Sequence, residues 1–206
     1  MSHKKANDLR SKRRFIPLKK QNKKLCNLTK MIYQPKEDSY LLKSIIKNYA
    51  KNKTVLDVGS GSGIQTVEAI KQKAKSVTAS DIDPETITHL KSLDQNIQVI
   101  ESDLFQNIEE KFDLIIFNPP YLPLDKREDE ESKKATTGGK RGDEIILKFL
   151  EQSKQNLNSD GKILLLLSSL TPRSRIKTLL NKQKLKHKPI TKKALFMETL
   201  EVWEIQ

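Results

Sequence analysis

The chain has 206 residues, of which 32% are charged and 35% hydrophobic, and its formal net charge is +13. This composition suits one α/β domain, and the longest apolar run, residues 163–167, is far too short to span a bilayer. One cysteine excludes an internal disulfide framework, and three scattered histidines offer no zinc-ligand spacing, so no metal is expected. We expect a reduced cytoplasmic protein that has neither a signal peptide nor a membrane segment.

The positive charge is concentrated at the amino terminus. Residues 1–30 hold 11 Lys or Arg and one acid, whereas the remaining 176 residues hold 28 basic and 25 acidic residues, a net +3. Because residues 1–30 lack a helical or strand period, we expect a basic, disordered extension drawn to polyanions such as RNA or the ribosome. Two alternatives remain open. The segment could be a nuclear localisation signal, or it could be a dispensable extension if translation starts at Met31.

From residue 53 onward, short apolar blocks alternate with helical patterns. They predict strands over 54–58, 76–80, 97–101, 112–117 and 162–168. Helices are expected within 32–50 after a turn, from the glycine-rich turn through about 71, from Pro84, from 142 to about 155 and from 172 to about 181. This alternation predicts a doubly wound, mostly parallel sheet within one domain, residues 31–206. Residues 186–206 hold two apolar stretches with no helix between them, and we expect them to close the sheet as an antiparallel hairpin.

A glycine-rich turn directly follows the first predicted strand, in Asp57-Val-Gly-Ser-Gly-Ser-Gly63. Glycine lets the backbone approach a ligand closely, and the following helix adds amide donors. Ile64 stands where a dinucleotide fingerprint requires glycine. The leading carboxylate of Asp57 would repel a pyrophosphate but attract an ammonium group. The motif therefore predicts a ligand with a positive end and no phosphates, approached by Gly59 and Gly61.

Two further acids follow the next two strands. Asp81 ends the second strand, where a carboxylate can accept both ribose hydroxyls. Asp103 follows the third strand and is placed to accept a hydrogen bond from an adenine amine, with Ile82 and Leu104 flanking the ring. Each acid could instead be a helix N-cap. Three acids at successive strand ends, together with the glycine turn, favour a single ligand crevice.

The fourth strand leads into Asn118-Pro119-Pro120-Tyr121. The two prolines fix the backbone and remove N–H groups, so carbonyl acceptors dominate this corner. We expect the Asn118 side-chain carbonyl and the Pro119 backbone carbonyl to accept both protons of an NH2 group, with the Tyr121 ring beside its planar carrier. This arrangement aims the nitrogen lone pair at a methyl donor and requires no general base. The alternative is a stiff strand-to-loop turn.

This combination resembles the class I S-adenosylmethionine-dependent methyltransferases, which have a seven-stranded Rossmann-like sheet that ends in an antiparallel hairpin. Asn-Pro-Pro-Tyr occurs in members that methylate planar amino groups. Three stretches resemble the HemK-type protein glutamine methyltransferases of the archaeal and eukaryotic branch, which act on release factors: Tyr33-Gln-Pro-Lys-Glu-Asp-Ser-Tyr-Leu-Leu42, Thr137-Gly-Gly-Lys-Arg-Gly-Asp-Glu-Ile-Ile146 and Glu198-Thr-Leu-Glu-Val202. The chain departs from the pattern of this family at two positions. Gln34 stands where the family usually has an acid, and Asp57 stands where many members of this branch have Glu.

The resemblance implies methylation of the glutamine in the Gly-Gly-Gln motif of a peptide chain release factor. The expected cofactor is S-adenosylmethionine, and a small zinc-binding activator subunit near the third strand is an implied partner. The residues and the resemblance together give nine expected cofactor contacts: Ser39, Asp57, Gly59, Gly61, Asp81, Ile82, Asp103, Leu104 and Asn118. The expected substrate contacts are Asn118, Pro119, Pro120 and Tyr121, of which Asn118, Pro119 and Tyr121 are the catalytic residues.

Two other functions remain open. One is methylation of an exocyclic amino group of a base in RNA or DNA, which the basic tail favours. The near-neutral body and the low aromatic content, 5%, favour a protein substrate instead. The other is an RNA-binding module that retains a methyltransferase fold. The intact Asn-Pro-Pro-Tyr motif and the three acids argue against it, because simple binding has no need for them.

Overall fold

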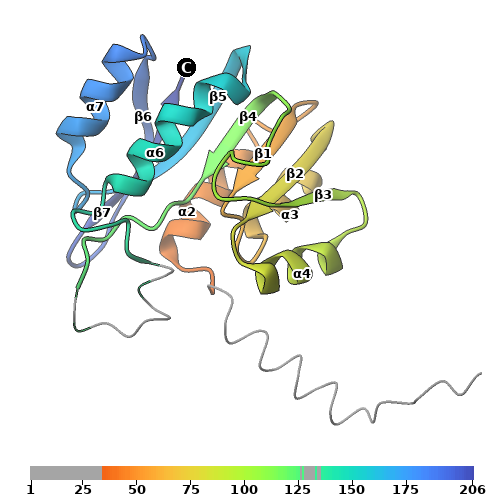
Figure 1. Ribbon diagram of the computed structural model, residues 1–206, viewed down its shortest axis with the longest axis horizontal. Coiled ribbons are helices and arrows are strands. Elements are labelled where there is room, and N and C mark those ends of the chain that lie inside the picture. The colour runs from red at the N-terminus through yellow and green to blue at the C-terminus, as the bar shows by residue number, and fades with distance from the viewer. Residues whose placement is uncertain (1–33, 126, 128–132, 134–135) are drawn as a thin grey trace, which may run out of the picture. The chain divides into compact units, whose positions relative to one another are not determined.

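The computed structural model describes residues 34–125, 127, 133 and 136–206, which include a seven-stranded sheet flanked by helices (Figure 1). The strands are β1 Thr54–Val58, β2 Ser76–Asp81, β3 Ile97–Glu101, β4 Phe112–Phe117, β5 Leu157–Ser168, β6 His187–Ala194 and β7 Thr199–Ile205. The helices are α2 Glu37–Ile46, α3 Ile64–Lys71, α4 Pro84–Leu93, α6 Glu144–Ser153 and α7 Arg173–Lys182, with a 3-10 turn at Lys154–Asn156. The extension predicted for residues 1–30 lies outside the described residues.

The strand order is β3-β2-β1-β4-β5-β7-β6, and β7 runs antiparallel to both of its neighbours. All other pairings are parallel. The predicted doubly wound sheet with a C-terminal antiparallel hairpin is therefore confirmed. The chain progresses outward from β1 to β3 and then returns to β4, so the order reverses between β1 and β4, where Val58 pairs with Phe117. An open α/β sheet binds its ligand at such a reversal.

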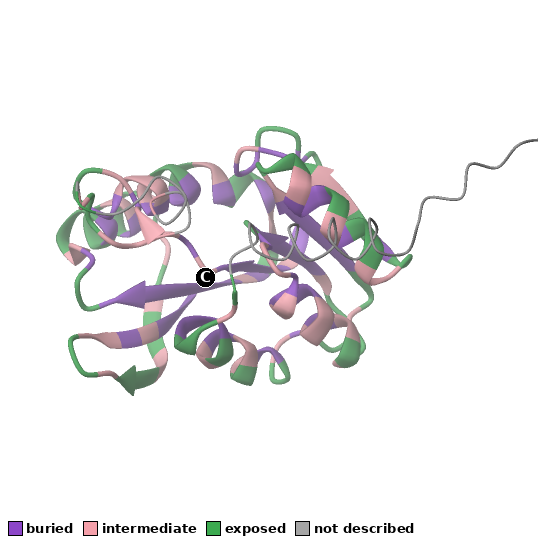
Figure 2. Cartoon of the chain, turned by 90° about the horizontal axis from the view of Figure 1, so that it is seen from below, coloured by how far each residue is buried: buried purple, intermediate pink, exposed green. Residues whose placement is uncertain are grey.

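Both faces of the central strands are covered, as the burial colours of Figure 2 show. In β4, Ile115 packs with residues of α6 and α7, whereas Leu114 and Ile116 pack on the opposite face with residues of α2 and α3. Helix α6 forms because its buried residues recur at helical spacing. These residues are Ile146, Phe149, Leu150 and Ser153. A strand buried on both faces is rigid, so the residue that follows β4 is held in place.

Two strands begin several residues before their predicted starts. Strand β5 begins at Leu157, five residues before the predicted start, because the polar residues 158–160 lie at a sheet end where apolar side chains are not required. Strand β6 begins at His187, before the apolar stretch, and Phe196 and Met197 lie in the turn, with 98% and 77% of their surface exposed. Strand β6 is an outer strand with exposed lysines, so its pattern is not apolar.

Candidate active site

The glycine turn after β1 opens onto the reversal point of the sheet. Gly59, Gly61 and Gly63 all have positive φ angles, between 50° and 74°. A Cβ atom at Gly61 would meet nothing within 4 Å, so this position faces open space. A Cβ atom at Gly63 would lie 2.4 Å from the Leu93 side chain, so Gly63 serves the packing of α4. Gly61 is therefore the glycine that leaves room for a ligand.

Asp57 is the most buried of the predicted site acids, with 1% of its surface exposed. Its Oδ2 accepts hydrogen bonds from the Thr66 amide (3.0 Å) and the Thr66 hydroxyl (2.6 Å), at the start of α3. Burial raises the pKa of Asp57 to about 7, although the bonds from Thr66 oppose the shift. The carboxyl group is thus poised between its neutral and charged forms near neutral pH. A cationic group beside it would favour the charged form.

Asp81 lies against the glycine turn, as the strand-end argument predicts. Its Oδ2 accepts from the Gly61 amide (3.0 Å) and its Oδ1 accepts from the Asp83 amide (3.0 Å). Burial raises the pKa of Asp81, while these amides oppose the shift. The cap of α4 is Asp83, which accepts from the Thr86 amide at 2.8 Å. The N-cap alternative is therefore wrong for Asp81, although Asp57 does bind an amide in the first turn of a helix.

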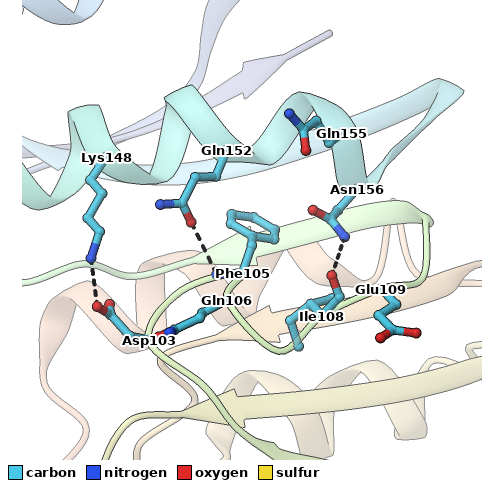
Figure 3. A pocket seen from close by; sticks show the side chains of 9 residues that line it. All are labelled: Asp103, Phe105, Gln106, Ile108, Glu109, Lys148, Gln152, Gln155 and Asn156. Carbon is cyan, nitrogen blue, oxygen red and sulfur yellow. Dashed lines mark hydrogen bonds and ion pairs between the residues drawn. The ribbon is translucent and has the colours of Figure 1, made fainter.

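Asp103 forms an ion pair with Lys148 of α6, with 2.6 Å between Nζ and Oδ2 (Figure 3). The pair borders an open groove of about 650 Å³ between α6 and the segment after β3. Of the two predicted adenine flanks, Ile82 is 65% exposed and open to a ligand, whereas Leu104 is buried in the core with a φ of 54°. Lys148 thus pairs with one oxygen of the carboxylate that was expected to receive the adenine amine.

Asn118 has one partnered and one unpartnered side-chain atom. Its Nδ2 donates to Asp38 Oδ2 (3.2 Å) and to the Ser39 hydroxyl (3.4 Å), both in the first turn of α2. Its Oδ1 is buried and has no hydrogen-bond partner among the described residues. Because a carboxylate can only accept, the NH2 of Asn118 must face Asp38, which leaves Oδ1 to accept from another donor. An unpaired buried acceptor costs about 1–3 kcal/mol, so this atom fits a substrate NH2.

A second cluster of glycines, Gly138, Gly139 and Gly142, packs against the backbone of the segment that begins at Pro120. A Cβ atom at Gly138 would lie 2.6 Å from the Pro120 carbonyl oxygen, and one at Gly142 would lie 2.7 Å from the Tyr121 carbonyl oxygen. The Thr171 hydroxyl donates to the same Tyr121 oxygen at 3.2 Å. Residues 138–142 therefore pack directly on the backbone of residues 120–123. Glycine is needed there because no side chain fits.

The charges of two acids that the residue patterns did not single out as site residues act on Tyr121. Burial raises the pKa of Tyr121 well above its usual value, and the charges of Asp38 and Glu198 add to the shift. Glu198, in the turn between β6 and β7, accepts a short hydrogen bond from the Ser168 hydroxyl at the end of β5. Asp38 and Glu198 lie in segments that carry the family resemblance, which could have marked them as site residues. Nothing in the sequence marked Lys148 in this way.

The described residues bring one side of the predicted site together. Ser39, Asp38 and Asn118 are in hydrogen-bond contact, and Gly61 contacts Asp81. Gln65 of α3, the helix that follows the glycine turn, contacts the first group, because its Nε2 donates to the Ser39 carbonyl at 3.0 Å. The described part of the chain has no cluster of three or more His, Cys, Asp or Glu placed to hold a metal ion. None of its helices has the length and apolar character needed to cross a membrane.

Residues 36–197 match the family model described as Methyltransferase small domain. The chain belongs to this family. A Methanocaldococcus jannaschii protein named as a protein N5-glutamine methyltransferase is 40% identical over 148 residues, which cover 68% of this chain and 74% of that protein. A release factor glutamine methyltransferase of Rhodopirellula baltica is 37% identical over 135 residues. That match covers 57% of this chain and 45% of the bacterial protein, so the chain spans about half the length of this relative.

Solved structures share the fold at lower identity. The Mtq2–Trm112 complex of E. cuniculi, responsible for methylation of the eRF1 translation termination factor, has a TM-score of 0.69 and 21% identity, and covers 85% of this chain and 98% of that chain. A T. thermophilus 16S rRNA N2 G1207 methyltransferase, solved with AdoMet and guanosine, has a TM-score of 0.61 and 19% identity, covering 84% and 43%. These matches confirm the Rossmann-like methyltransferase fold, and the relatives confirm the resemblance to HemK-type enzymes.

Proposed function

We propose that this protein methylates the side-chain amide of the glutamine in the Gly-Gly-Gln motif of a peptide chain release factor, with S-adenosylmethionine as methyl donor. The observation that carries the proposal is the buried Oδ1 of Asn118, an acceptor without a hydrogen-bond partner in the described part of the chain. The names of the archaeal and bacterial relatives, protein N5-glutamine and release factor glutamine methyltransferase, support this substrate.

The residues at the carboxyl ends of β1 and β2 fit a cationic nucleoside ligand. Gly61 leaves open space beside Asp81, whose carboxylate is suited to accept ribose hydroxyls. The exposed Ile82 side chain can cover one face of an adenine ring. Asp57 provides a carboxyl group whose charged form a nearby cation would favour. When bound, S-adenosylmethionine supplies a methyl group made electrophilic by its sulfonium.

The Asn118 corner prepares the amide nitrogen for attack. The Asn118 Oδ1 and the Pro119 carbonyl each accept one of the two amide protons. This raises electron density on a nitrogen whose lone pair is otherwise delocalised, and it fixes the nitrogen in line with the methyl group. Tyr121 packs beside the planar amide. The proton leaves after transfer, so no general base is needed.

A small zinc-binding activator subunit is the proposed partner, and β3 is its proposed contact. In the described sheet β3 is an edge strand that pairs with β2 alone. The two-chain composition of the structurally similar Mtq2–Trm112 complex supports a partner of this kind.

A labelled-methyl transfer assay tests the substrate, with release factor, tRNA, rRNA and DNA offered side by side to the full chain. We expect label in the release factor alone, and we expect its loss when the Gly-Gly-Gln glutamine is replaced by alanine. Label in RNA or DNA instead of the release factor would support base methylation and overturn the proposal. The assay is run with and without the zinc-binding subunit from the same organism, so that an inactive single chain is distinguished from a wrong substrate.

A further inference from the structure

The near-neutral body of the chain consists of two oppositely charged regions. Residues 161–197 hold 10 Lys or Arg and no Asp or Glu, whereas the rest of residues 31–206 holds 18 basic and 25 acidic residues. The net charge of +3 for residues 31–206 therefore hides a strongly basic segment. This segment folds as most of β5, α7, the connection after it and β6, and α7 and β6 lie toward the same end of the sheet in Figure 1.

Half of these ten cations form no salt bridge among the described residues, although the charge of Lys192 helps to lower the pKa of Glu201 on β7. Arg173, Arg175, Lys188 and Lys193 form salt bridges with Glu201, Asp143, Glu204 and Glu37. Five exposed lysines form no salt bridge with any carboxylate of the described chain: Lys177, Lys182, Lys184, Lys186 and Lys192. We call α7, residues 183–186 and β6 the basic edge. Strand β6 is the outer strand of the sheet here, and its eight residues extend about 26 Å.

We propose that the basic edge binds the phosphate backbone of RNA. Lysine is depleted in protein–protein interfaces, which instead bury aromatic and apolar side chains at their centre. The described residues of the basic edge have no exposed Phe, Tyr or Trp. The exposed apolar side chains that flank it along the chain, Leu170 before α7 and Phe196 and Met197 after β6, lie outside it. Unpaired lysines that follow one another through α7, residues 183–186 and β6 instead suit a row of phosphates, whose binding releases counterions.

The contact is to the backbone and not to the bases. Trp203 is 2% exposed, and Arg173 and Lys177 lie over its ring at 5.7 and 5.9 Å, while His187 stacks against it at 4.7 Å. These rings are occupied by contacts within the protein and offer no platform for base stacking. We therefore expect binding that depends on salt and not on sequence.

The basic edge leads toward the candidate active site without entering it. Ala194 pairs with Thr199, and Leu200 pairs with Ser168 at the end of β5, so β6 ends at the same margin of the sheet as Asn118. RNA on this edge would therefore lie beside the bound protein substrate. It would be a docking partner and not the methyl acceptor, which goes beyond the proposed function.

The test measures anisotropy of a fluorescein-labelled RNA hairpin, titrated with the full chain over a range of salt concentrations. The edge variant is Lys182→Gln/Lys184→Gln/Lys186→Gln. The matched control, Lys71→Gln/Lys91→Gln/Lys111→Gln, removes the same charge from exposed lysines elsewhere. Each phosphate contact contributes about 0.7–0.9 to the salt slope, so we expect the edge variant to lower the slope by about 2 and to bind roughly tenfold more weakly. The control should change affinity less than about twofold.

Equal weakening in both triple variants would show that net charge alone matters and would overturn the proposal. Unchanged RNA affinity combined with a raised KM for the release factor would assign the edge to an acidic protein surface, and would also overturn it. Methyl transfer to free release factor should be unaffected in both variants. If the edge variant has a lower Tm, the pair Lys182→Gln/Lys186→Gln, at exposed positions, should still lower the salt slope by more than a matched control pair, Lys71→Gln/Lys111→Gln.

Discussion

The side-chain amide of Asn118 donates a hydrogen bond to the carboxylate of Asp38, with 3.2 Å between Nδ2 and Oδ2, although 80 residues separate the two. Asp38 is 5% exposed and lies in the first turn of α2, where a helix favours negative charge. The helix that precedes the sheet therefore determines how the residue after β4 presents its carbonyl oxygen. Asp38 is a positioning residue that acts through Asn118.

Replacing Asp38 should slow methyl transfer without displacing the cofactor. In Asp38→Ala, the Asn118 amide loses the acceptor that fixes its orientation, at a cost of about 1.5–3 kcal/mol for a hydrogen bond to a charged group. This corresponds to a fall of about 10- to 100-fold in kcat. Single-turnover rates and calorimetric titration of S-adenosylmethionine measure the two effects. Asp38→Asn retains an acceptor and should recover part of the rate.

The neighbouring Glu37→Gln variant is the control for Asp38. Glu37 is exposed on the same helical turn and pairs with Lys193, so it shares the helix environment but does not contact Asn118. We expect this variant to keep the parental rate. An equal loss in Glu37→Gln would mean that α2 acts through its general stability and that Asp38 has no positioning role.

Asn118→Ala should abolish methyl transfer and leave cofactor binding largely intact. The substitution removes the Oδ1 that is to accept a substrate proton, while the glycine turn and Asp81 remain in place. Calorimetry of S-adenosylmethionine binding, alongside the labelled-methyl assay, separates the two functions. Loss of binding in proportion to the loss of activity would place Asn118 in the cofactor site and remove it from the substrate site.

The sequence predicted the elements of the sheet well because each buried strand has a distinct apolar block. Strands β1, β3 and β4 have the predicted bounds, and Asp81 lies where the end of β2 places it. Parallel strands carry their carboxyl ends to one margin, so residues that follow them converge without any knowledge of packing. Asn118, Asp81 and Gly61 could be assigned in this way.

The side-chain partnerships could not be predicted by the same reasoning. Lys148 and Asp103 are 45 residues apart, and the rotation of α6 over the sheet, which brings them together, depends on how Phe149 packs against Phe105 and Phe117. Leu104 was expected at the adenine, but its positive φ turns it into the core. The basic edge was missed because the net charge was summed over residues 31–206 as a whole, and this sum hides the ten basic and no acidic residues of 161–197.

The buried carboxyl group of Asp57 should make stability depend on pH. Its pKa is about 7 in the folded protein, against 3.8 for an ordinary aspartate, so the folded state binds this proton more tightly. The stabilisation that comes from this tighter proton binding is complete below about pH 4 and is lost as pH rises toward 7. The free energy of unfolding falls by at most about 1.4 kcal/mol per pH unit in this range. Asp57→Asn keeps an acceptor for Thr66 but cannot titrate.

Urea unfolding of both proteins between pH 4 and 8 measures this difference. We expect the parent to lose stability relative to Asp57→Asn as pH rises to about 7, and the difference to be constant above that pH. Comparing the two proteins at each pH cancels the titrating groups that do not interact with Asp57; Asp81, whose charge adds to the raised pKa of Asp57, is the exception. A difference that is constant across the whole range would show that the pKa of Asp57 is not raised in the folded protein.

Gly138→Ala should damage both stability and catalysis, because the new methyl group would press on the catalytic corner. It would lie 2.5 Å from the Gly142 carbonyl oxygen and 2.6 Å from that of Pro120, and backbone atoms cannot move aside as a flexible side chain can. Overpacking of this kind costs about 1–3 kcal/mol. Displacement of Pro120 also moves Pro119 and Asn118, since the prolines fix the backbone between them.

Lys140→Ala, at an exposed position in the same segment, is the control and should change neither unfolding nor the single-turnover rate. A variant that is less stable but transfers methyl groups at the parental rate would show that residues 138–142 support the fold without positioning Asn118.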